Sequence, residues 1–263
     1  MILIVALVTD ALSRTRISAA TGNKAIVIFC DSLRALRVAL ESDYTCAIIA
    51  EAQGKQNLPR LSAIRRIAET HPFIPIVALT NFDKRSIRAL FMLRGTPFTD
   101  VIFADSDAVA NAVDLALDRA GTAAARNWAA NAMLPILPGF AFRIVELFLL
   151  YDSGFPGSDE ISTALEISQR TLRHRLDSAG LPGAHRLIAH AQVLLAVRLL
   201  QDSKRKLHEV SRSVGFVNPA SLRALMRELA DMNPAEARQP DACARALDAF
   251  RRAIASESAA IPV

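Results

Sequence analysis

Two short stretches of this chain combine arginines with the spacing of a helix surface, and they are the residues best suited to bind a polyanion. The first is Leu165–Arg175, LEISQRTLRHR, and a similar pattern follows at Val214–Arg227, VGFVNPASLRALMR. In each, a tight turn precedes a helix that carries cations on its outer face. Arginine and amide side chains donate hydrogen bonds to phosphates and to base edges in the major groove. The pair therefore predicts two helix-turn-helix units.

The first unit has the pattern of a complete helix-turn-helix. A helix is predicted over Asp159–Leu165, a turn at Glu166–Ile167, and a second helix over Ser168–Ala179, whose opening serine can accept a hydrogen bond from the free amides of the first turn. Leu172 and Leu176 lie four residues apart and are expected to face inward. The outward side chains then lie where a recognition helix meets base edges. They are Gln169, Arg170, Arg173 and His174.

The second unit repeats this pattern with fewer hydrogen-bond donors. Asn218 is placed to cap its second helix, and Leu222 and Met226 are expected to face inward. Arg223 supplies a guanidinium fork that can pair with guanine through two hydrogen bonds. We therefore expect this unit to contribute mainly phosphate and thymine-methyl contacts. Its other outward positions are Pro219, Ala220 and Ala224.

Four segments together resemble the AraC/XylS family of transcription regulators. They are SQRTLRHRL at Ser168–Leu176, AVRLLQDSKRKL at Ala196–Leu207, VGF at Val214–Phe216 and MNPAEAR at Met232–Arg238. The resemblance spans residues 159–238 and implies two helix-turn-helix units joined by a long helix, here His185–Gln201. Gln192 departs from the arginine that the family often carries in this helix. The residues of the helix that are available for core packing are Leu187, Val193, Leu194, Val197 and Leu200.

The resemblance implies double-stranded DNA as the partner, bound through successive major grooves on one face of the duplex. Contact with RNA polymerase and a homodimer are further expectations. No nucleophile or paired carboxylate has a catalytic context, so the chain is predicted not to be an enzyme, and neither a metal nor a cofactor is expected. Arg227 and the SKRK segment at Ser203–Lys206 are expected to contact phosphates. The candidate DNA-binding residues are Gln169, Arg170, Arg173, His174, Lys204, Lys206, Asn218, Ser221, Arg223 and Arg227.

The first half of the chain alternates short apolar runs with segments of helical spacing. Strands that are apolar on both faces and joined by helices form a parallel sheet covered on both sides. We therefore predict a doubly wound α/β domain of the flavodoxin or CheY-like type, followed by an all-α domain. The predicted strands are Ile2–Val8, Ala25–Phe29, Cys46–Ala50, Ile74–Leu79 and Val101–Phe103. The predicted helices include Ser32–Leu40, Leu58–Glu69, Arg85–Leu93 and Ala108–Leu117.

This order of elements resembles the receiver domain of bacterial response regulators, with local similarity at Tyr44–Ala52 and Pro75–Thr80. A working receiver has an acidic pair after the first strand, an acceptor aspartate ending the third and a lysine after the fifth, because its Mg²⁺ requires oxygen ligands. Here a single Asp10 follows the first strand, Ala50 occupies the acceptor position and Ala104 the lysine position. Only the threonine that ends the fourth strand matches. A degenerate receiver that is not switched by aspartyl phosphate is therefore predicted.

Other readings of this half are weaker or less specific. Glu51 would reach the acceptor position with a one-residue shift, but it supplies neither the lysine nor the second acid. Asp10, Asp105 and Asp107 could gather at the strand ends, although such loop carboxylates are more often solvated caps than metal ligands. A glycine-rich turn, which a dinucleotide would need, is missing after the first strand. A flavodoxin-like domain without a specialised crevice remains the alternative to the degenerate receiver.

Composition sets broader bounds on the chain. With 263 residues, 52% of them hydrophobic, it can bury two ordinary cores. A net charge of +5 is compatible with a polyanionic partner but does not require one. Cys30, Cys46 and Cys243 show no metal-ligand spacing and are expected to be reduced. The apolar run Ile2–Val8 is too short to cross a bilayer, so a cytoplasmic location without a membrane partner is expected.

The predicted organisation has four parts. These are a degenerate receiver at 1–120, a linker at 121–139, a helical DNA-binding domain at 140–240 and a C-terminal helical tail at 241–263. In the linker, alanines favour continuing the preceding helix until Pro135 and Pro138 break it. The predicted function is sequence-specific regulation of transcription, with the N-terminal domain serving dimerisation or sensing a signal or partner. The alternative is a protein-interaction adaptor that has lost useful DNA affinity, because alanines occupy outward positions of the second unit.

Overall fold

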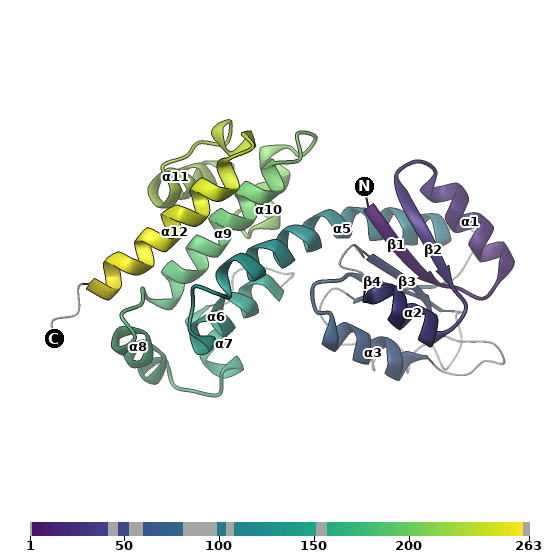
Figure 1. Cartoon of the computed structure of the whole chain (residues 1–263), viewed down its shortest axis with the longest axis horizontal. Helices are drawn as coiled ribbons and strands as arrows, with labels where there is room; N and C mark the ends of the chain where they lie inside the picture. Colours follow the sequence, from purple (N-terminus) through teal and green to yellow (C-terminus); the bar gives the residue numbers. More distant parts are fainter. Residues whose placement is uncertain are drawn as a thin grey trace. The chain divides into compact units, whose positions relative to one another are not determined.

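The computed structural model describes residues 2–41, 47–52, 60–80, 99–103, 108–150 and 157–259 (Figure 1). The chain divides into two compact units, Met1–Ala124 and Ala125–Val263. The first contains a five-stranded parallel sheet with flanking helices, and the second is helical. The predicted fold class is therefore confirmed.

All five predicted strands are present, with bounds shifted by at most two residues. They are β1 (Ile2–Leu7), β2 (Ala25–Cys30), β3 (Ala47–Glu51), β4 (Ile76–Thr80) and β5 (Thr99–Phe103). The strands pair in parallel in the order β2-β1-β3-β4-β5, which leaves β2 and β5 at the edges of this sheet. Cys46, the first residue of the predicted third strand, lies outside the described residues.

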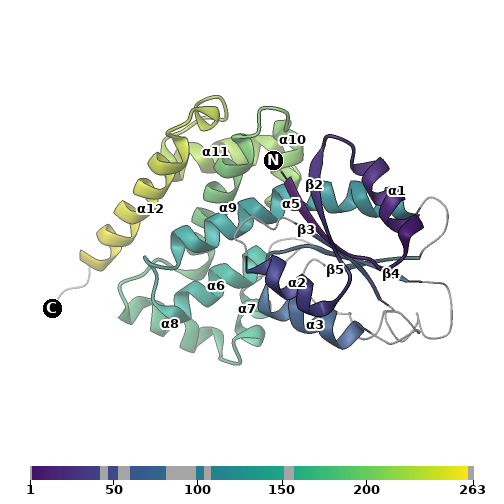
Figure 2. The same ribbon diagram turned by 45° about the vertical axis from the view of Figure 1, so that its right-hand side comes forward.

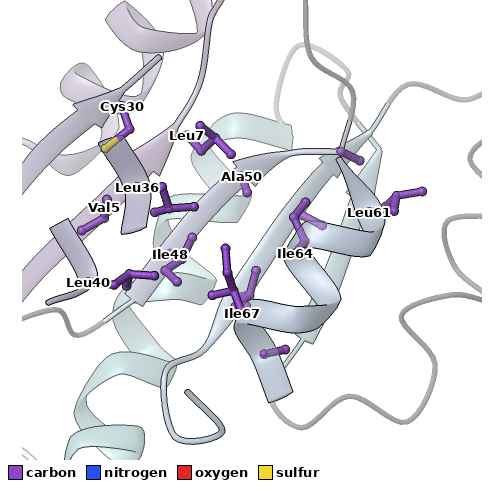
Figure 3. Close-up of a cluster of buried hydrophobic side chains, with 14 residues drawn as sticks. Val5, Leu7, Cys30, Leu36, Leu40, Ile48, Ala50, Leu61, Ile64 and Ile67 are labelled. Atoms are coloured by element: carbon purple, nitrogen blue, oxygen red, sulfur yellow. The ribbon is translucent and has the colours of Figure 1, made fainter. Parts of the chain in front are cut away.

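Four helices of the described residues cover this sheet: α1 (Ala11–Thr21), α2 (Leu33–Leu40), α3 (Leu61–Thr70) and α5 (Ala108–Met133). Successive strand residues point to opposite faces and therefore build two cores. Val5 and Leu7 pack with α2 and α3 on one face, as Figure 3 shows. Ile4 and Ala6 pack with α1 and α5 on the other face. The predicted helix Arg85–Leu93 lies outside the described residues.

α5 is longer than the predicted helix Ala108–Leu117. It continues through the alanine-rich segment to Met133, as the helix propensity of alanine favours, and Gly121 does not interrupt it. Pro135 and Pro138 follow, and the next helix begins at Gly139. The predicted helical extension and break are thus both present.

Eight elements follow α5 among the residues described in the helical unit. They are α6 (Gly139–Leu150), α7 (Ser158–Ala164), α8 (Gln169–Ser178), α9 (Ala184–Leu200), α10 (Leu207–Ser213), α11 (Pro219–Ala230), the short 3-10 helix η2 (Glu236–Arg238) and α12 (Ala242–Ala259). α9 is the centre of this unit, and α6, α10, α11 and α12 all pack against it (Figure 2). The five residues predicted for its core, from Leu187 to Leu200, are all buried.

α12 forms part of the same core. The Phe250 side chain is fully buried against His190 of α9, with ring centroids 5.3 Å apart. Near its end, the Ser258 hydroxyl donates to the Gly180 carbonyl just after α8 (3.1 Å). Among the described residues, no helix is long and apolar enough to cross a membrane.

Candidate nucleic-acid interface

The second compact unit contains two successive helix-turn-helix units with equivalent hydrogen bonds at the start of the first helix and in the turn. In the first, α7 begins where the Gly157 amide donates to the Glu160 carboxylate (2.7 Å). In the second, α10 begins where the Lys206 amide donates to the Glu209 carboxylate (2.8 Å). A carboxylate at this position satisfies an otherwise free amide and interacts favourably with the positive end of the helix dipole. The first helix of each unit is therefore stabilised at its start in the same way.

The turns are also equivalent. The amide of Ile167 donates to the Ser162 carbonyl at 3.1 Å, and the amide of Phe216 donates to the Ser211 carbonyl at 2.9 Å. Both turns pass through a left-handed residue just before these amides. Ser211 adds a side-chain hydrogen bond from its hydroxyl to the Phe216 carbonyl (3.2 Å). The predicted turns are therefore present in both units.

The second helices α8 and α11 are capped as predicted. The Ser168 hydroxyl accepts from the Thr171 amide (3.1 Å), and the Asn218 side chain accepts from the Ala220 amide (2.9 Å). The predicted inward residues are buried in both helices. They are Leu172 and Leu176 in α8, and Leu222 and Met226 in α11.

The outer face of α8 carries all four predicted reading residues. Gln169, Arg170, Arg173 and His174 are exposed. The Gln169 amide is hydrogen-bonded to the Asp159 carboxylate of α7, so the position of this side chain is held by the preceding helix. Within the described part of the chain, no side chain accepts a hydrogen bond from Arg170, Arg173 or His174. These three donors are available to an external ligand.

The outer face of α11 is more apolar. Ser221, Arg223 and Arg227 are exposed and offer donors, whereas Ala220 and Ala224 are exposed without any. Pro219 is half-buried at the first turn of α11, where its missing amide costs no helical hydrogen bond. Val217, which precedes the capping asparagine, is 96% exposed.

Two sets of hydrogen bonds tie the second unit to α9 and to the segment that follows it. The Gln192 side chain is buried and donates to the Val214 carbonyl at the end of α10 (2.9 Å). The Arg238 guanidinium donates to the carbonyls of Leu200, Asp202 and Arg205, at 3.1, 3.1 and 2.7 Å. Sequence reasoning missed Arg238, although it closes the MNPAEAR segment. Lys204 and Lys206 lie exposed between α9 and α10, as phosphate contacts require.

The carboxyl edge of the sheet is arranged differently from a phosphate acceptor site. Glu51 ends β3, and its carboxylate accepts from the Thr9 amide (3.0 Å) and the Thr9 hydroxyl (2.8 Å). Arg60 lies 4.0 Å from the same carboxylate. Asp10 caps α1 by accepting from the Ser13 amide, and this hydrogen bond is the main cause that lowers the pKa of its carboxyl. Ala50 is fully buried.

Other predicted positions on this edge are only partly described. Thr80 ends β4 and is buried. Ala104, Asp105 and Asp107 lie outside the described residues. Among the residues that the structure describes, no group of three or more histidine, cysteine or acidic side chains could hold a metal ion. Cys30 and Cys243 are free, and burial raises the pKa of both thiols.

Comparison with known proteins gives one family match. The model of a helix-turn-helix domain of the AraC type matches residues 161–240. No curated protein and no solved structure matches the chain. The matched range covers both units, from α7 to the residues just after η2. By this match and by its geometry, the segment 161–240 is similar to helix-turn-helix domains that bind DNA in transcription regulators.

Proposed function

We propose that this protein is a sequence-specific DNA-binding transcription regulator in which α8 and α11 enter the major groove. The observation that carries this proposal is the repeated backbone of the two units, each with an exposed second helix. The second unit packs against α9, and α9 begins shortly after α8 ends, so one long helix joins the two units. A preorganised pair can contact one duplex without a further loss of conformational freedom.

In this proposal, α8 and α11 make different kinds of contact with DNA. α8 reads base edges through Arg170, Arg173 and His174, because these exposed donors have no partner among the described residues. α11 offers Arg223 for guanine and otherwise contacts thymine methyl groups and phosphates, because Ala220 and Ala224 occupy its outer face. The further contacts to phosphate or sugar come from Lys204, Lys206, Ser221 and Arg227.

We further propose that the N-terminal domain is a degenerate receiver that serves dimerisation or senses a signal or partner without aspartyl phosphorylation. Ala50 carries no nucleophile, and the nearest carboxylate, that of Glu51, is hydrogen-bonded to Thr9. A carboxylate engaged in this way is a poor phosphate acceptor. For the domain boundaries, we propose those predicted from the sequence. They give the receiver at 1–120, the linker at 121–139, the DNA-binding domain at 140–240 and the tail at 241–263.

A regulator of this kind works in the cytoplasm, where it meets both duplex DNA and RNA polymerase. The DNA sequence that the protein recognises is found by selecting bound duplexes from a random library with the full-length protein. Affinity for the selected duplex is then measured between roughly 50 and 200 mM salt. The logarithm of the association constant should fall with the logarithm of the salt concentration by about 0.9 per phosphate contacted.

The adaptor alternative gives a different result in this experiment. It is favoured by the alanines at positions 220 and 224, which reduce the hydrogen-bonding capacity of α11. An adaptor would select no common sequence and would show no salt-dependent binding even at low ionic strength. The charge-reversed variant Arg170→Glu/Arg173→Glu is the control, because it should abolish selection by a true reader and leave an adaptor unchanged.

A further inference from the structure

β2 is an edge strand whose outer side is open in the described sheet. It pairs with β1 on its inner side, and in the described chain no strand lies beyond it. Edge strands of monomeric proteins commonly carry charged residues, proline or a bulge, which prevent pairing with other chains. The six residues of β2, AIVIFC, contain neither charge nor proline, and their pairing with β1 is continuous from Ala25 to Cys30. Within the described part of the sheet, this edge is therefore unprotected.

Two large apolar side chains of β2 are exposed as well. Ile26 is 45% exposed and Ile28 is 42% exposed. Ala25, Val27 and Phe29 pack on the α1 and α5 side of the sheet, so by alternation the two isoleucines lie on the α2 side. A backbone edge and an apolar face thus adjoin each other on one strand.

The direction of the backbone groups follows from one hydrogen bond. The amide of Val8, the residue directly after β1, donates to the Cys30 carbonyl at 3.2 Å. The amide and carbonyl of one strand residue point to the same side. The backbone groups of residues 26, 28 and 30 therefore point toward β1. The amides and carbonyls of Ala25, Val27 and Phe29 consequently point away from the sheet.

We propose that two copies of this chain associate through antiparallel pairing of their β2 strands about Val27. In this register Val27 faces Val27 of the second copy, and Ala25 faces Phe29. All three outward residues then exchange backbone hydrogen bonds. Ile26 lies opposite Ile28 of the second copy on the same face, so the exposed isoleucines cover one another. The two copies form one continuous sheet.

Charge at the strand ends favours a second copy over an unrelated strand. Lys24 precedes β2 and Asp31 follows it, and both are exposed. Antiparallel pairing places the cationic end of one strand beside the anionic end of the other. Lys24 already pairs with Asp114 at 3.2 Å, but both side chains are more than 60% exposed, so this ion pair contributes little and leaves the lysine available. The edge is therefore complementary to itself in backbone, apolar surface and charge.

This inference specifies the self-association proposed for the N-terminal domain, and it does not require DNA binding. Sedimentation velocity of the full-length protein over a range of concentrations should show a monomer–dimer equilibrium. The variant Ile26→Lys/Ile28→Lys should raise the dimer dissociation constant by about tenfold or more, because like charges then face each other across the pair. The matched control Leu12→Lys/Leu134→Lys changes two other exposed apolar residues and should leave the constant unchanged.

Circular dichroism and urea unfolding establish that both double variants fold. A wild-type protein that remains monomeric overturns the inference, whatever its affinity for DNA. A dimer that survives the β2 lysines overturns it too, since the interface then lies elsewhere. A dimer that fails to select DNA contradicts only the proposed function, so the two failures are distinguishable.

The register has its own test. In the proposed pairing, residues 26 and 28 of opposite copies form a non-hydrogen-bonded pair with Cα atoms about 4.5 Å apart, which a disulfide can bridge. Ile26→Cys/Ile28→Cys should therefore give a covalent dimer on mild oxidation. Leu12→Cys/Leu134→Cys and the wild type, with its native cysteines, should not. Equal cross-linking of all three proteins, or none of the β2 variant, overturns this register.

Discussion

Glu166 and Gly215 occupy equivalent positions in the two turns, and both have a left-handed backbone, with φ of 55° and 91°. Glycine adopts this conformation without steric cost, whereas a residue with a Cβ loses about 1–2 kcal/mol. The first turn therefore contains a strained glutamate where the second contains glycine. The amides that follow, those of Ile167 and Phe216, make equivalent hydrogen bonds, so the strain does not change the turn.

Replacing Glu166 by glycine should stabilise the protein. The strain is relieved, and the greater freedom of glycine in the unfolded chain offsets part of the gain, so the unfolding free energy should rise by about 0.5–1 kcal/mol. Gly215→Ala should lower it by about 1 kcal/mol or more. Urea unfolding checks both values. Ala224→Gly, in the exposed middle of α11, is the control and should lose about 1 kcal/mol; a similar loss for Glu166→Gly would contradict the strained turn.

The strained glutamate also shows what sequence reasoning can and cannot reach. The turn at Glu166–Ile167 was predicted from its position between two helical patterns, but a glutamate gives no sign of a positive φ. In the second turn, Gly215 adopts a positive φ without a Cβ clash. Local spacing thus predicted a turn in each unit, whereas the positive φ of Glu166 is seen only in the folded turn between α7 and α8.

The same division applies to the sheet and to the ends of the chain. Apolar runs located all five strands, since burial on both faces leaves a continuous signal. α1 gave a weak signal, because only Ile17 and Thr21 of its residues are buried. The Thr9–Glu51 hydrogen bonds join residues far apart in the sequence and depend on the strand order. The contact between Phe250 of α12 and His190 of α9 likewise joins residues far apart in the sequence, so only the fold gives it.

Acidification should destabilise the helical unit through His190. Burial, with a smaller contribution from the Arg186 charge, lowers the pKa of this imidazole from 6.5 to about 4. The neutral form is thus favoured in the folded state. The contribution of the neutral imidazole to the unfolding free energy is complete above pH 6.5. It is lost as the pH falls from 6.5 to about 4, by up to about 3 kcal/mol. Urea unfolding across this range measures the loss.

His190→Leu should flatten the pH dependence in this window. The substitution keeps an apolar group against Phe250, and the described residues give His190 Nε2 no hydrogen-bond partner that would be lost. His208→Leu, an exposed change on α10, is the control and should retain the wild-type dependence. An unchanged pH profile in His190→Leu would assign the loss to other groups.

Gln192→Leu should lower the unfolding free energy by about 1–3 kcal/mol. The change leaves the buried Val214 carbonyl without the Gln192 side-chain donor. Chemical denaturation measures this loss. Arg198→Ala, an exposed change on the same helix, should stay within about 0.5 kcal/mol of the wild type. Equal stability of the two variants would mean that the hydrogen bond makes no net contribution.

Acetyl phosphate should not label the N-terminal domain. Glu51 is engaged by Thr9, and Ala50 has no acceptor atom. Phosphate-affinity electrophoresis and mass spectrometry of the full-length protein after incubation with acetyl phosphate and Mg²⁺ check this expectation. An acid-labile phosphoryl group on Asp10 or Glu51, absent from the corresponding Asp10→Asn or Glu51→Gln variant, would show a working receiver.

Substitutions on the proposed DNA-binding surface should separate base reading from phosphate contact. Arg170→Ala or Arg173→Ala should lose about 1–3 kcal/mol of binding free energy on the selected duplex and relax preference at one base position, because a guanidinium pairs with a particular base edge. Lys204→Ala should weaken binding to all sequences alike and reduce the salt dependence by about one phosphate.

Fluorescence anisotropy with the selected duplex, with single-base variants of it and with an unrelated duplex measures these differences. Arg252→Ala is the matched control, because Arg252 is an exposed arginine of α12 outside both helix-turn-helix units. Its affinity should equal that of the wild type. Uniform weakening by Arg170→Ala, Arg173→Ala and Lys204→Ala on every duplex would refute base reading by α8, since contacts to the phosphate backbone carry no direct sequence information.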